Sequence, residues 1–421
     1  MSQRDFIRSV LRNMKAIYTL FSLFLAALFL FSGNVLFLNS SNLLMGHATV
    51  PQTLIGLINT VYFLGAIMSS VAAHRIVSRV GHARSFSFFA SIMAICILLY
   101  GLSFQLYVWA ILRFIQGFAY YAVLMIIESW LNEKSDPSSR SRLLGIYEIV
   151  FYMAFSIGAL LLNLSNSFVH ITQFSVILLI LAILPLSLTK IPAPIIPEPK
   201  KISIPSLFAL APLALMGSLI GGFIANGFMS MIPVYTSNLH FNVRETSIFM
   251  TCAMAGGLLI QLPMGRFSDT YGRRIAISIA ASITCAAALL SLFLVHVTYA
   301  QYLLAAGFGL GAFSIYPLSL ARAHDVLPAD SPSRIEISRS VLFAYSLGAL
   351  AAPLTLGIST QILGAVGFET PFILLSAFLA FFAIRQPVIP QEERTSYVHV
   401  TPSATNTLIA ESDSIKETEK L

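Results

Sequence analysis

The side chains that could carry chemistry are few, because ionisable residues rarely interrupt the apolar runs of this sequence. Arg113 lies inside the run LRFIQGF, and Gln116 follows it at a spacing that puts both on one face of a helix. Glu128 and Glu148 are acids in the apolar stretches that follow. Ionisable groups in such surroundings need partners, and they often form proton pathways. These four residues are therefore candidates for moving a proton.

Each of these residues also has a purely structural interpretation. Arg113 could bond to backbone carbonyls and hold helices together. It cannot meet Glu128 within one helix, because 15 residues separate them and span about 22 Å. If their helices are antiparallel neighbours, Glu128 and Glu148 lie at similar depth. Both acids could instead face water or pair with Arg140 or Arg142.

A dense motif follows in the second half of the chain, GRFSDTYGRR, which begins at Gly265. Gly265 permits close helix approach, and Gly272 permits a tight turn. Asp269 can start a helix or pair with an arginine. The paired Arg273 and Arg274 would anchor the loop on the cytoplasmic side of a membrane.

A degraded copy of this motif, SRVGHAR, occupies positions 78–84. Ser78 stands where the acid should be, so a charge-based contact is not expected there. Both loops could alternatively serve as topological anchors only. The turn and basic residues of the copy are Arg79, Gly81 and Arg84.

The ends of two further apolar runs bear on function. Glu128-Ser-Trp-Leu-Asn132 closes one run, and Tyr316-Pro-Leu-Ser-Leu-Ala-Arg-Ala-His-Asp325 closes another. We interpret the His324-Asp325 end, with Arg322 nearby, as a solvated helix end. A gate at the inner surface is the alternative.

The composition defines the elements that must position these side chains. Of the 421 residues, 57% are apolar and 10% are charged, against about 25% charged in soluble domains. This excludes a soluble, disordered or collagen-like chain. Cys96, Cys252 and Cys285 lie in apolar runs without metal-ligand spacing, so we expect no metal site and no disulfide framework. The basic residues are scattered, which argues against nucleic acid as a partner despite the net charge of +7.

Apolar runs of about 20 residues can cross a bilayer as helices. The sequence contains twelve, so we predict an all-α membrane protein made of two pseudo-symmetric bundles of six helices. The predicted spans are 17–39, 54–75, 86–104, 106–131, 142–163, 168–188, 207–236, 247–268, 273–295, 299–322, 337–360 and 365–384.

The basic residues support this count. With the N-terminus in the cytoplasm, 23 of the 25 Lys and Arg residues fall at cytoplasmic segments or span ends. Arg244 falls outside, and Arg113 falls within a span. This distribution follows the positive-inside rule. Both chain ends are therefore predicted to be cytoplasmic.

A connector rich in proline divides the chain, and the halves repeat each other. Gly81 and Gly272 are 191 positions apart, and Gly117-Phe118 and Gly307-Phe308 are 190 apart. Duplicated halves are typical of transporters that rock around a central site. The predicted segments are a cytoplasmic N-terminus (1–16), a bundle (17–188), a cytoplasmic linker (189–206), a bundle (207–384) and a disordered cytoplasmic tail (385–421).

The GRFSDTYGRR loop resembles the G-x-x-x-D-x-x-G-R-[RK] motif of the major facilitator superfamily. The resemblance covers about residues 15–385, and the ends 128–132 and 316–325 are similar to those of YcaD-like transporters. It implies a latch role for the loop. Arg113-x-x-Gln116-Gly resembles the fourth-span motif of proton-coupled members. It also implies a central cavity lined by spans one and seven, which contain Asn34 and Asn226. Further candidate lining residues, each of which could equally be a packing or interfacial residue, are Tyr62, Tyr147, Tyr152, Gln261 and Tyr316.

The resemblance implies secondary active transport of a small solute, coupled to protons, across a bacterial inner membrane by a monomer without a cofactor. Proton-driven drug efflux is a variant, although the stretch 145–159 lacks the closing Gly-Pro of such antiporters. A transporter-like receptor that binds a partner through its tail is another class. An enzyme is disfavoured because no ATP-binding loop, metal motif or nucleophile elbow occurs.

Overall fold

The computed structural model describes residues 3–134, 140–188, 211–326 and 333–394, and within them we find helices and short connections but no strand. Twelve helices are long and apolar enough to cross a membrane, which confirms the predicted fold class. They are α1 (Gln3–His47), α2 (Gln52–Val80), α3 (His82–Tyr100), α4 (Leu106–Lys134), α5 (Arg140–Leu160), α6 (Phe168–Ser187), α8 (Pro212–Asn238), α9 (Val243–Tyr271), α10 (Arg273–Phe293), α11 (Thr298–Asp325), α12 (Ser333–Leu363) and α13 (Ala365–Ile384).

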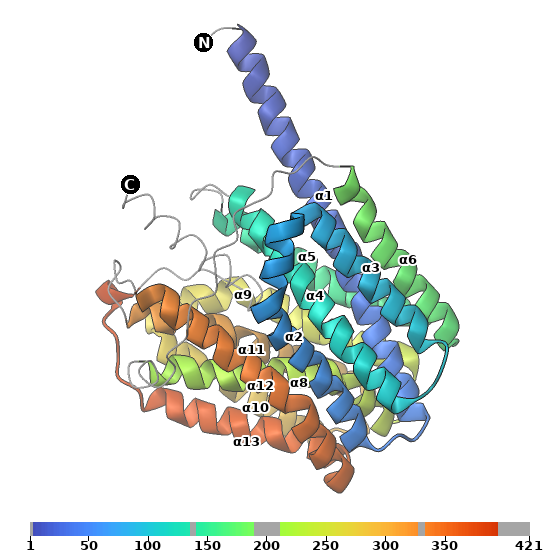
Figure 1. Cartoon of the computed structure of the whole chain (residues 1–421). Helices are drawn as coiled ribbons and strands as arrows, with labels where there is room; N and C mark the ends of the chain where they lie inside the picture. Colours follow the sequence, from blue (N-terminus) through green and yellow to red (C-terminus); the bar gives the residue numbers. More distant parts are fainter. Residues whose placement is uncertain (1–2, 135–139, 189–210, 327–332, 395–421) are drawn as a thin grey trace.

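The helices form two bundles, α1–α6 and α8–α13, and the predicted linker 189–206 lies outside the described residues. We call the side with the α2–α3 and α9–α10 turns and the end of α13 the basic face. The side with the α1–α2 and α8–α9 turns is the opposite face. The helices of the two bundles converge toward the opposite face and diverge toward the basic face (Figure 1).

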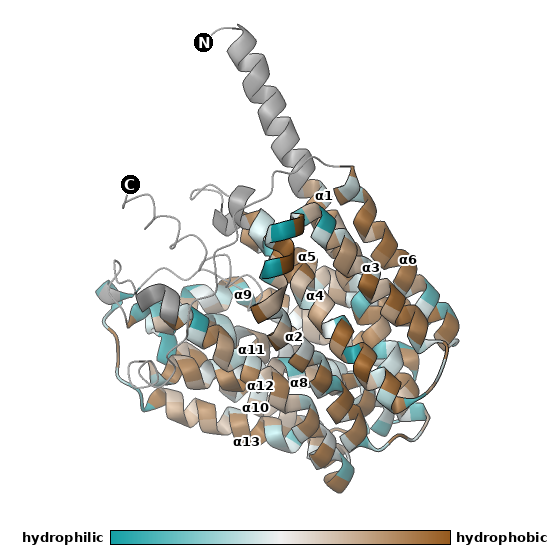
Figure 2. Cartoon of the chain, viewed as in Figure 1, coloured by the Kyte–Doolittle hydropathy of each residue, from teal (hydrophilic) through white to brown (hydrophobic). Residues whose placement is uncertain are grey.

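The outer surface is apolar. Large side chains such as Leu64, Ile95, Leu102 and Leu262 are exposed, and apolar residues cover the flanks of both bundles (Figure 2). Exposing these apolar side chains to water would be energetically unfavourable, whereas lipid tails are as apolar as the side chains themselves. The exposed side chains therefore mark the lipid-facing surface.

Glycines bring the backbones of α2 and α4 into direct contact. A Cβ added at Gly117 would overlap the carbonyl oxygen of Tyr62, and one added at Gly65 would overlap that of Phe114. Small residues allow this close approach in membranes, where helix association depends on packing. The crossing point of α2 and α4 is thus fixed from both sides.

The second bundle repeats this crossing between α9 and α11. A Cβ at Gly256 would overlap the carbonyl of Ala306, and one at Gly309 would overlap that of Ala253. Gly65 and Gly256 are 191 positions apart, and Gly117 and Gly309 are 192 apart. Gly117 therefore corresponds by contact to Gly309, two residues beyond the Gly307 that the sequence comparison pairs with it.

Several contacts between the halves lie at the opposite face. The side chain of Gln52 donates to Asn238 Oδ1 at 3.0 Å, and the backbone N–H of Thr53 donates to Gln361 Oε1 at 3.0 Å. A Cβ at Gly56 of α2 would also overlap α12. These contacts hold the two bundles together at that face.

The predicted disordered tail, 385–421, needs a correction at its start. Residues 385–394 fold against the basic face and include a 3-10 turn, Gln391–Glu393. The side chain of Arg394 donates to the carbonyls of Asp269 and Thr270 at 3.1 and 3.0 Å. Polar composition suggested disorder, but these main-chain acceptors at the end of α9 order the segment.

The glycine crossing predicts a sharp difference between two substitutions. Gly117→Ala should lower the free energy of unfolding by about 1–3 kcal/mol, because the backbones must separate. Gly145→Ala is the control, since a Cβ there meets nothing within 4 Å. SDS titration of the protein in mixed micelles measures both. Equal stability of the two variants would contradict a fixed crossing.

Candidate functional site

Arg113 is fully buried in the first bundle. Its Nη2 donates to Ser41 Oγ at 2.7 Å and to Asn42 Oδ1 at 3.1 Å. The guanidinium carbon lies 5.7 and 5.9 Å from the ring centroids of Phe37 and Tyr100. Ring faces attract a cation within such distances. The positive charge is therefore held by dipoles and aromatic rings.

Part of this guanidinium is unsatisfied. Nε and Nη1 of Arg113 are buried and have no hydrogen-bond partner among the described residues. No carboxylate within that part of the chain forms an ion pair with it either. Leaving buried donors of a charged group unpaired is costly. The arginine is consequently poised to take an additional acceptor.

Gln116, one turn beyond the arginine, connects three helices. Its Nε2 donates to Asn34 Oδ1 of α1 at 3.0 Å, and Asn34 Nδ2 donates to the hydroxyl of Tyr62 in α2 at 3.3 Å. All three side chains are buried. Asn34 in a predicted cavity-lining span and the candidate Tyr62 thus bond to side chains of the first bundle, and their role in a central cavity stays a prediction.

One backbone carbonyl on α8 accepts hydrogen bonds from two asparagines of the first half. Asn42 Nδ2 donates to the carbonyl oxygen of Ser230 at 2.8 Å, and Asn59 Nδ2 donates to the same oxygen at 3.3 Å. Pro233 lies three residues further along α8 and lacks an N–H, which loosens the helix locally. We call this contact the asparagine clamp. Through Asn42 it connects Arg113 to the second bundle.

The carboxylates of Glu128 in α4 and Glu148 in α5 are both buried, with exposed fractions of 1% and 4%. Phe31 of α1 lies between these helices, since its ring is 5.9 Å from that of Tyr120 and 6.2 Å from that of Tyr147. The two helices are therefore not packed as direct neighbours at this level. Glu148 follows Tyr147 directly, whereas Glu128 lies about two turns beyond Tyr120 along α4.

On the second bundle, Asn226 and Tyr316 belong to one polar group. Asn226 Nδ2 donates to the carbonyl of Gly222 at 2.9 Å, and its side chain hydrogen-bonds with Tyr345. The ring of Tyr316 lies edge-on to Tyr345 at 4.7 Å. These contacts join α8, α11 and α12 of the second bundle.

The predicted residues Tyr152 and Gln261 meet each other. Gln261 Nε2 of α9 donates to the hydroxyl of Tyr152 in α5 at 2.8 Å, so this pair also joins the halves. Nearer the opposite face, Asn163 Nδ2 donates to Ser247 Oγ at 3.1 Å. Together the two bonds follow the α5–α9 contact.

The GRFSDTYGRR loop is built around a buried arginine. Arg273 Nε donates to Asp325 Oδ2 of α11 at 3.1 Å, and both side chains have no exposed surface. Arg273 Nη1 also contacts Asp269 Oδ1 at 2.6 Å and Ser268 Oγ at 2.7 Å. The interpretation of Asp325 as part of a solvated helix end is wrong, because the arginine draws its carboxylate inside.

The other loop residues have distinct roles. Gly272 has a φ of +99°, which favours glycine, and Gly265 is buried in α9. Arg274 Nη1 donates to the carbonyls of Ile384 and Gln386 at 3.1 and 2.9 Å. The two arginines therefore bind protein groups, and their predicted anchoring of the loop on the cytoplasmic side stays a prediction.

The degraded first copy keeps the turn without the ion pair. Gly81 has a φ of +90°, while Arg79 and Arg84 are exposed. His82 stands 191 positions before Arg273 and is buried, with its Nε2 3.2 Å from Ser129 Oγ. A hydrogen bond thus occupies the place of the buried ion pair.

Some central residues were not found from the sequence. The clamp residue Asn42 lay in a predicted loop, because the first span was ended at residue 39 and α1 continues to His47. Glu369 in α13 is buried, with Tyr235 and Ser291 as hydrogen-bonding partners. Its signal was an acid within a predicted span. No cluster of potential metal ligands occurs in the described residues.

A sequence profile of the Major Facilitator Superfamily matches residues 21–335 and again 214–406. The chain belongs to this superfamily. Similar relatives include an uncharacterized MFS-type transporter of Yersinia pestis, 25% identical over 90% of this chain and 98% of the relative. Another is the uncharacterized MFS-type transporter YcaD of Escherichia fergusonii, 24% identical over 73% of this chain and 80% of the relative.

Solved superfamily structures share the fold. The nucleoside transporter NupG has a TM-score of 0.67 at 17% identity, covering 87% of this chain and 98% of its own. A bacterial homologue of the human lysosomal transporter Spinster, inward-facing and occupied, has a TM-score of 0.66 at 17% identity over 90% and 98% of the chains. As a superfamily member, the chain is a multi-pass membrane transporter.

The two acids that contact Arg273 predict unequal effects. Asp325→Asn should lower the free energy of unfolding by about 3–5 kcal/mol, because it breaks a buried ion pair. Asp269→Asn should cost less than about 1 kcal/mol, since 43% of that side chain is exposed. SDS denaturation in mixed micelles compares them. Similar losses for both variants would contradict a buried ion pair as the centre of this loop.

Proposed function

We propose that this transporter moves a small solute by alternating access, coupled to protons through Arg113 and a carboxylate of Glu128 or Glu148. It would do so in a bacterial inner membrane with the basic face in the cytoplasm, because basic residues collect on that side. The proposal includes both uptake and drug efflux, because the gradients of proton and solute set the direction of transport.

The observation that carries the proposal is the hydrogen-bonded chain from Arg113 through Asn42 to the carbonyl of Ser230. A charge buried in one bundle is thereby connected to a contact between the bundles. Alternating access requires the bundles to rock against each other around a central site. Separating them at the opposite face would break the bond from Asn42.

The unsatisfied nitrogens of Arg113 give the chain a means of control. An acceptor that binds there competes for the guanidinium with Asn42 Oδ1. Losing that bond leaves Asn42 free to reorient and weakens its hold on Ser230. Solute or a protonation change near the arginine would in this way favour one state of the carrier over the other.

The acids supply the exchangeable proton. Glu128 and Glu148 are both buried within membrane-spanning helices. When a buried carboxylate binds a proton it becomes neutral, and the carrier can then pass through its closed state without burying that charge. The relatives' own substrates, such as nucleosides for NupG, are not assigned to this chain.

Transport can be tested without knowing the solute. Proteoliposomes that contain a pH-sensitive dye are given fractions of a bacterial metabolite extract, and solute-dependent proton movement is recorded. Arg113→Gln should reduce the proton movement by about tenfold or more. Arg244→Gln, on the opposite face, is the control and should leave it unchanged. Proton movement by Arg113→Gln at the unaltered rate, or its absence for every fraction, would contradict the proposal.

Glu128→Gln separates proton coupling from solute movement. A permanently neutral side chain should keep solute exchange across the vesicle membrane but lose accumulation driven by a pH gradient. The same assay on Glu148→Gln identifies which acid carries the proton. Accumulation that survives in both variants would exclude these acids as the coupling groups.

The chain from Arg113 to the clamp predicts non-additive effects on the closed state. In a background with Cys96, Cys252 and Cys285 replaced by serine, Gln52→Cys and Asn238→Cys report closure by disulfide formation. Asn42→Ala and Asn59→Ala should each slow cross-linking about 2- to 10-fold, the value of one hydrogen bond.

Adding Arg113→Gln should then change little in the Asn42→Ala protein but slow cross-linking further in the Asn59→Ala protein. Both asparagines bind the same carbonyl, and Arg113 bonds only to Asn42 of the two. Equal, additive effects in both backgrounds would show that the arginine does not act through Asn42.

A further inference from the structure

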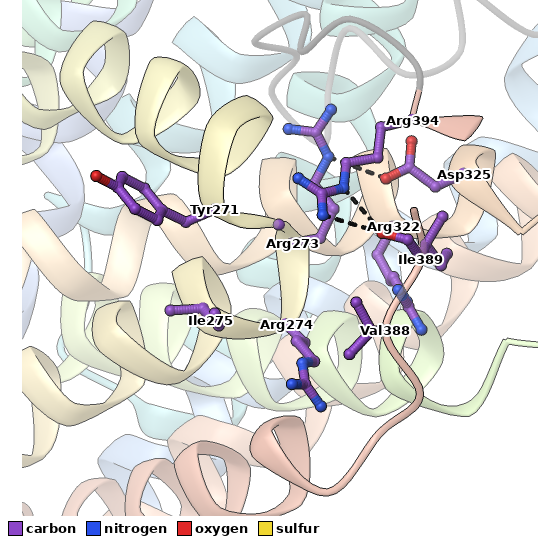
Figure 3. A pocket seen from close by; sticks show the side chains of 10 residues that line it. Tyr271, Arg273, Arg274, Ile275, Arg322, Asp325, Val388, Ile389 and Arg394 are labelled. Carbon is purple, nitrogen blue, oxygen red and sulfur yellow. Dashed lines mark hydrogen bonds and ion pairs between the residues drawn. The ribbon is translucent and has the colours of Figure 1, made fainter. Parts of the chain in front are cut away.

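A pocket lies at the basic face between the start of α10, the end of α11 and the segment 385–394 (Figure 3). Its cavity volume is about 40 Å³. Its polar lining is unusual in charge, because four guanidinium groups and one carboxylate surround it. The charged lining residues are Arg273, Arg274, Arg322, Arg394 and Asp325.

The carboxylates near the pocket already pair with one of its arginines. Asp325 and Asp269 both contact Arg273, which lies on the inner side of the pocket. None of the other three arginines forms an ion pair among the described residues, although the charge of Asp325 also acts on Arg322. Arg274 and Arg394 donate to main-chain carbonyls, and so does Arg322, to Pro387 at 2.8 Å. Positive charge is therefore in excess.

The excess is energetically unfavourable in this position. Arg322 is only 5% exposed; the charge of Asp325 attracts it, while those of Arg274 and Arg394 repel it. Like charges repel more strongly where water is scarce. Backbone carbonyls accept hydrogen bonds but do not neutralise a guanidinium. An anion in the pocket would reduce the repulsion between the guanidinium groups and would also neutralise part of their charge.

The backbone keeps the space open. Gly272 lines the pocket with a φ of +99°, and a Cβ there would stand 3.2 Å from a terminal nitrogen of Arg394. The segment 385–394 closes the other side and brings Arg394 over the end of α9. The pocket is thus formed by the fold, in contrast to a set of mobile surface arginines.

We propose that this pocket binds a phosphate group, either from a phospholipid headgroup or from a soluble phosphate. Guanidinium forks match the oxygens of a phosphate, which can accept from several arginines together. The pocket also lies at helix ends on the basic face, at the level where phospholipid phosphates meet a membrane protein. This site is separate from Arg113 and does not depend on the proposed transport.

A rival anion is the chain's own C-terminus. Arg394 lines the pocket, and the residues that follow it in the sequence include several acids. They are Glu411, Asp413, Glu417 and Glu419. The phosphate is favoured because it can accept from three guanidinium groups within a small volume, while a carboxylate has fewer oxygens for them.

Native mass spectrometry of the full chain in a neutral detergent tests the site. One arm adds phosphatidylglycerol and the other adds inorganic phosphate. We expect one retained adduct in at least one arm, and the arm identifies the source. Arg274→Gln and Arg394→Gln should each weaken retention about tenfold, whereas Arg274→Lys should weaken it less.

Arg385→Gln is the matched control, because Arg385 is exposed, stacks on Phe381 at 4.1 Å and does not line the pocket. Gel filtration confirms that every variant is folded before binding is measured. Equal retention by the Arg274→Gln, Arg394→Gln and Arg385→Gln proteins would overturn the proposal. So would the absence of an adduct in both arms.

A shortened chain that ends at Val400 distinguishes a bound phosphate from the acidic C-terminal residues. If the phosphate site is correct, the full and shortened chains retain the adduct equally. If only the shortened chain retains it, the acidic tail occupies the pocket and the proposal is overturned. The readout is binding alone, so its failure would leave the proposed transport unaffected.

Discussion

A positive charge that cannot reach water constrains the first bundle. Arg113 of α4 has no exposed surface, and the acceptors and ring faces around it come from α1 and α3. In a bilayer no solvent can replace them. The registers of these helices are thereby related to one another. The same shell includes Asn42, which extends the constraint to α8 in the other bundle.

The second organising feature is contact between backbones. Gly65 and Gly117 place α2 against α4, and Gly256 and Gly309 repeat the arrangement for α9 and α11. Because lipid tails provide no hydrophobic drive for helix association, such close packing must supply it. The repeat fixes one helix crossing in each bundle by backbone contact. The proposed rocking would then take place where the bundles meet.

The two halves treat the same loop differently. In the second half, Arg273 is buried with Asp325, and the segment 385–394 folds over the turn. In the first half, His82, which stands 191 positions before Arg273, hydrogen-bonds with Ser129 of α4. A buried ion pair is costly to break by removing one partner. The loop of the second half is accordingly the more firmly fastened of the two.

The sequence by itself determined the membrane environment, the twelve helices, the duplication and the superfamily, because apolar run length and local motifs carry that information. It also singled out Arg113, since a lone charge in an apolar run is visible without any structure. Only the tertiary structure decided its partners, the clamp on Ser230 and the burial of Asp325. Those depend on which helices pack together and at what register, and side chains more than a hundred positions apart, such as Asn42 and Ser230, leave no local pattern that would reveal their contact.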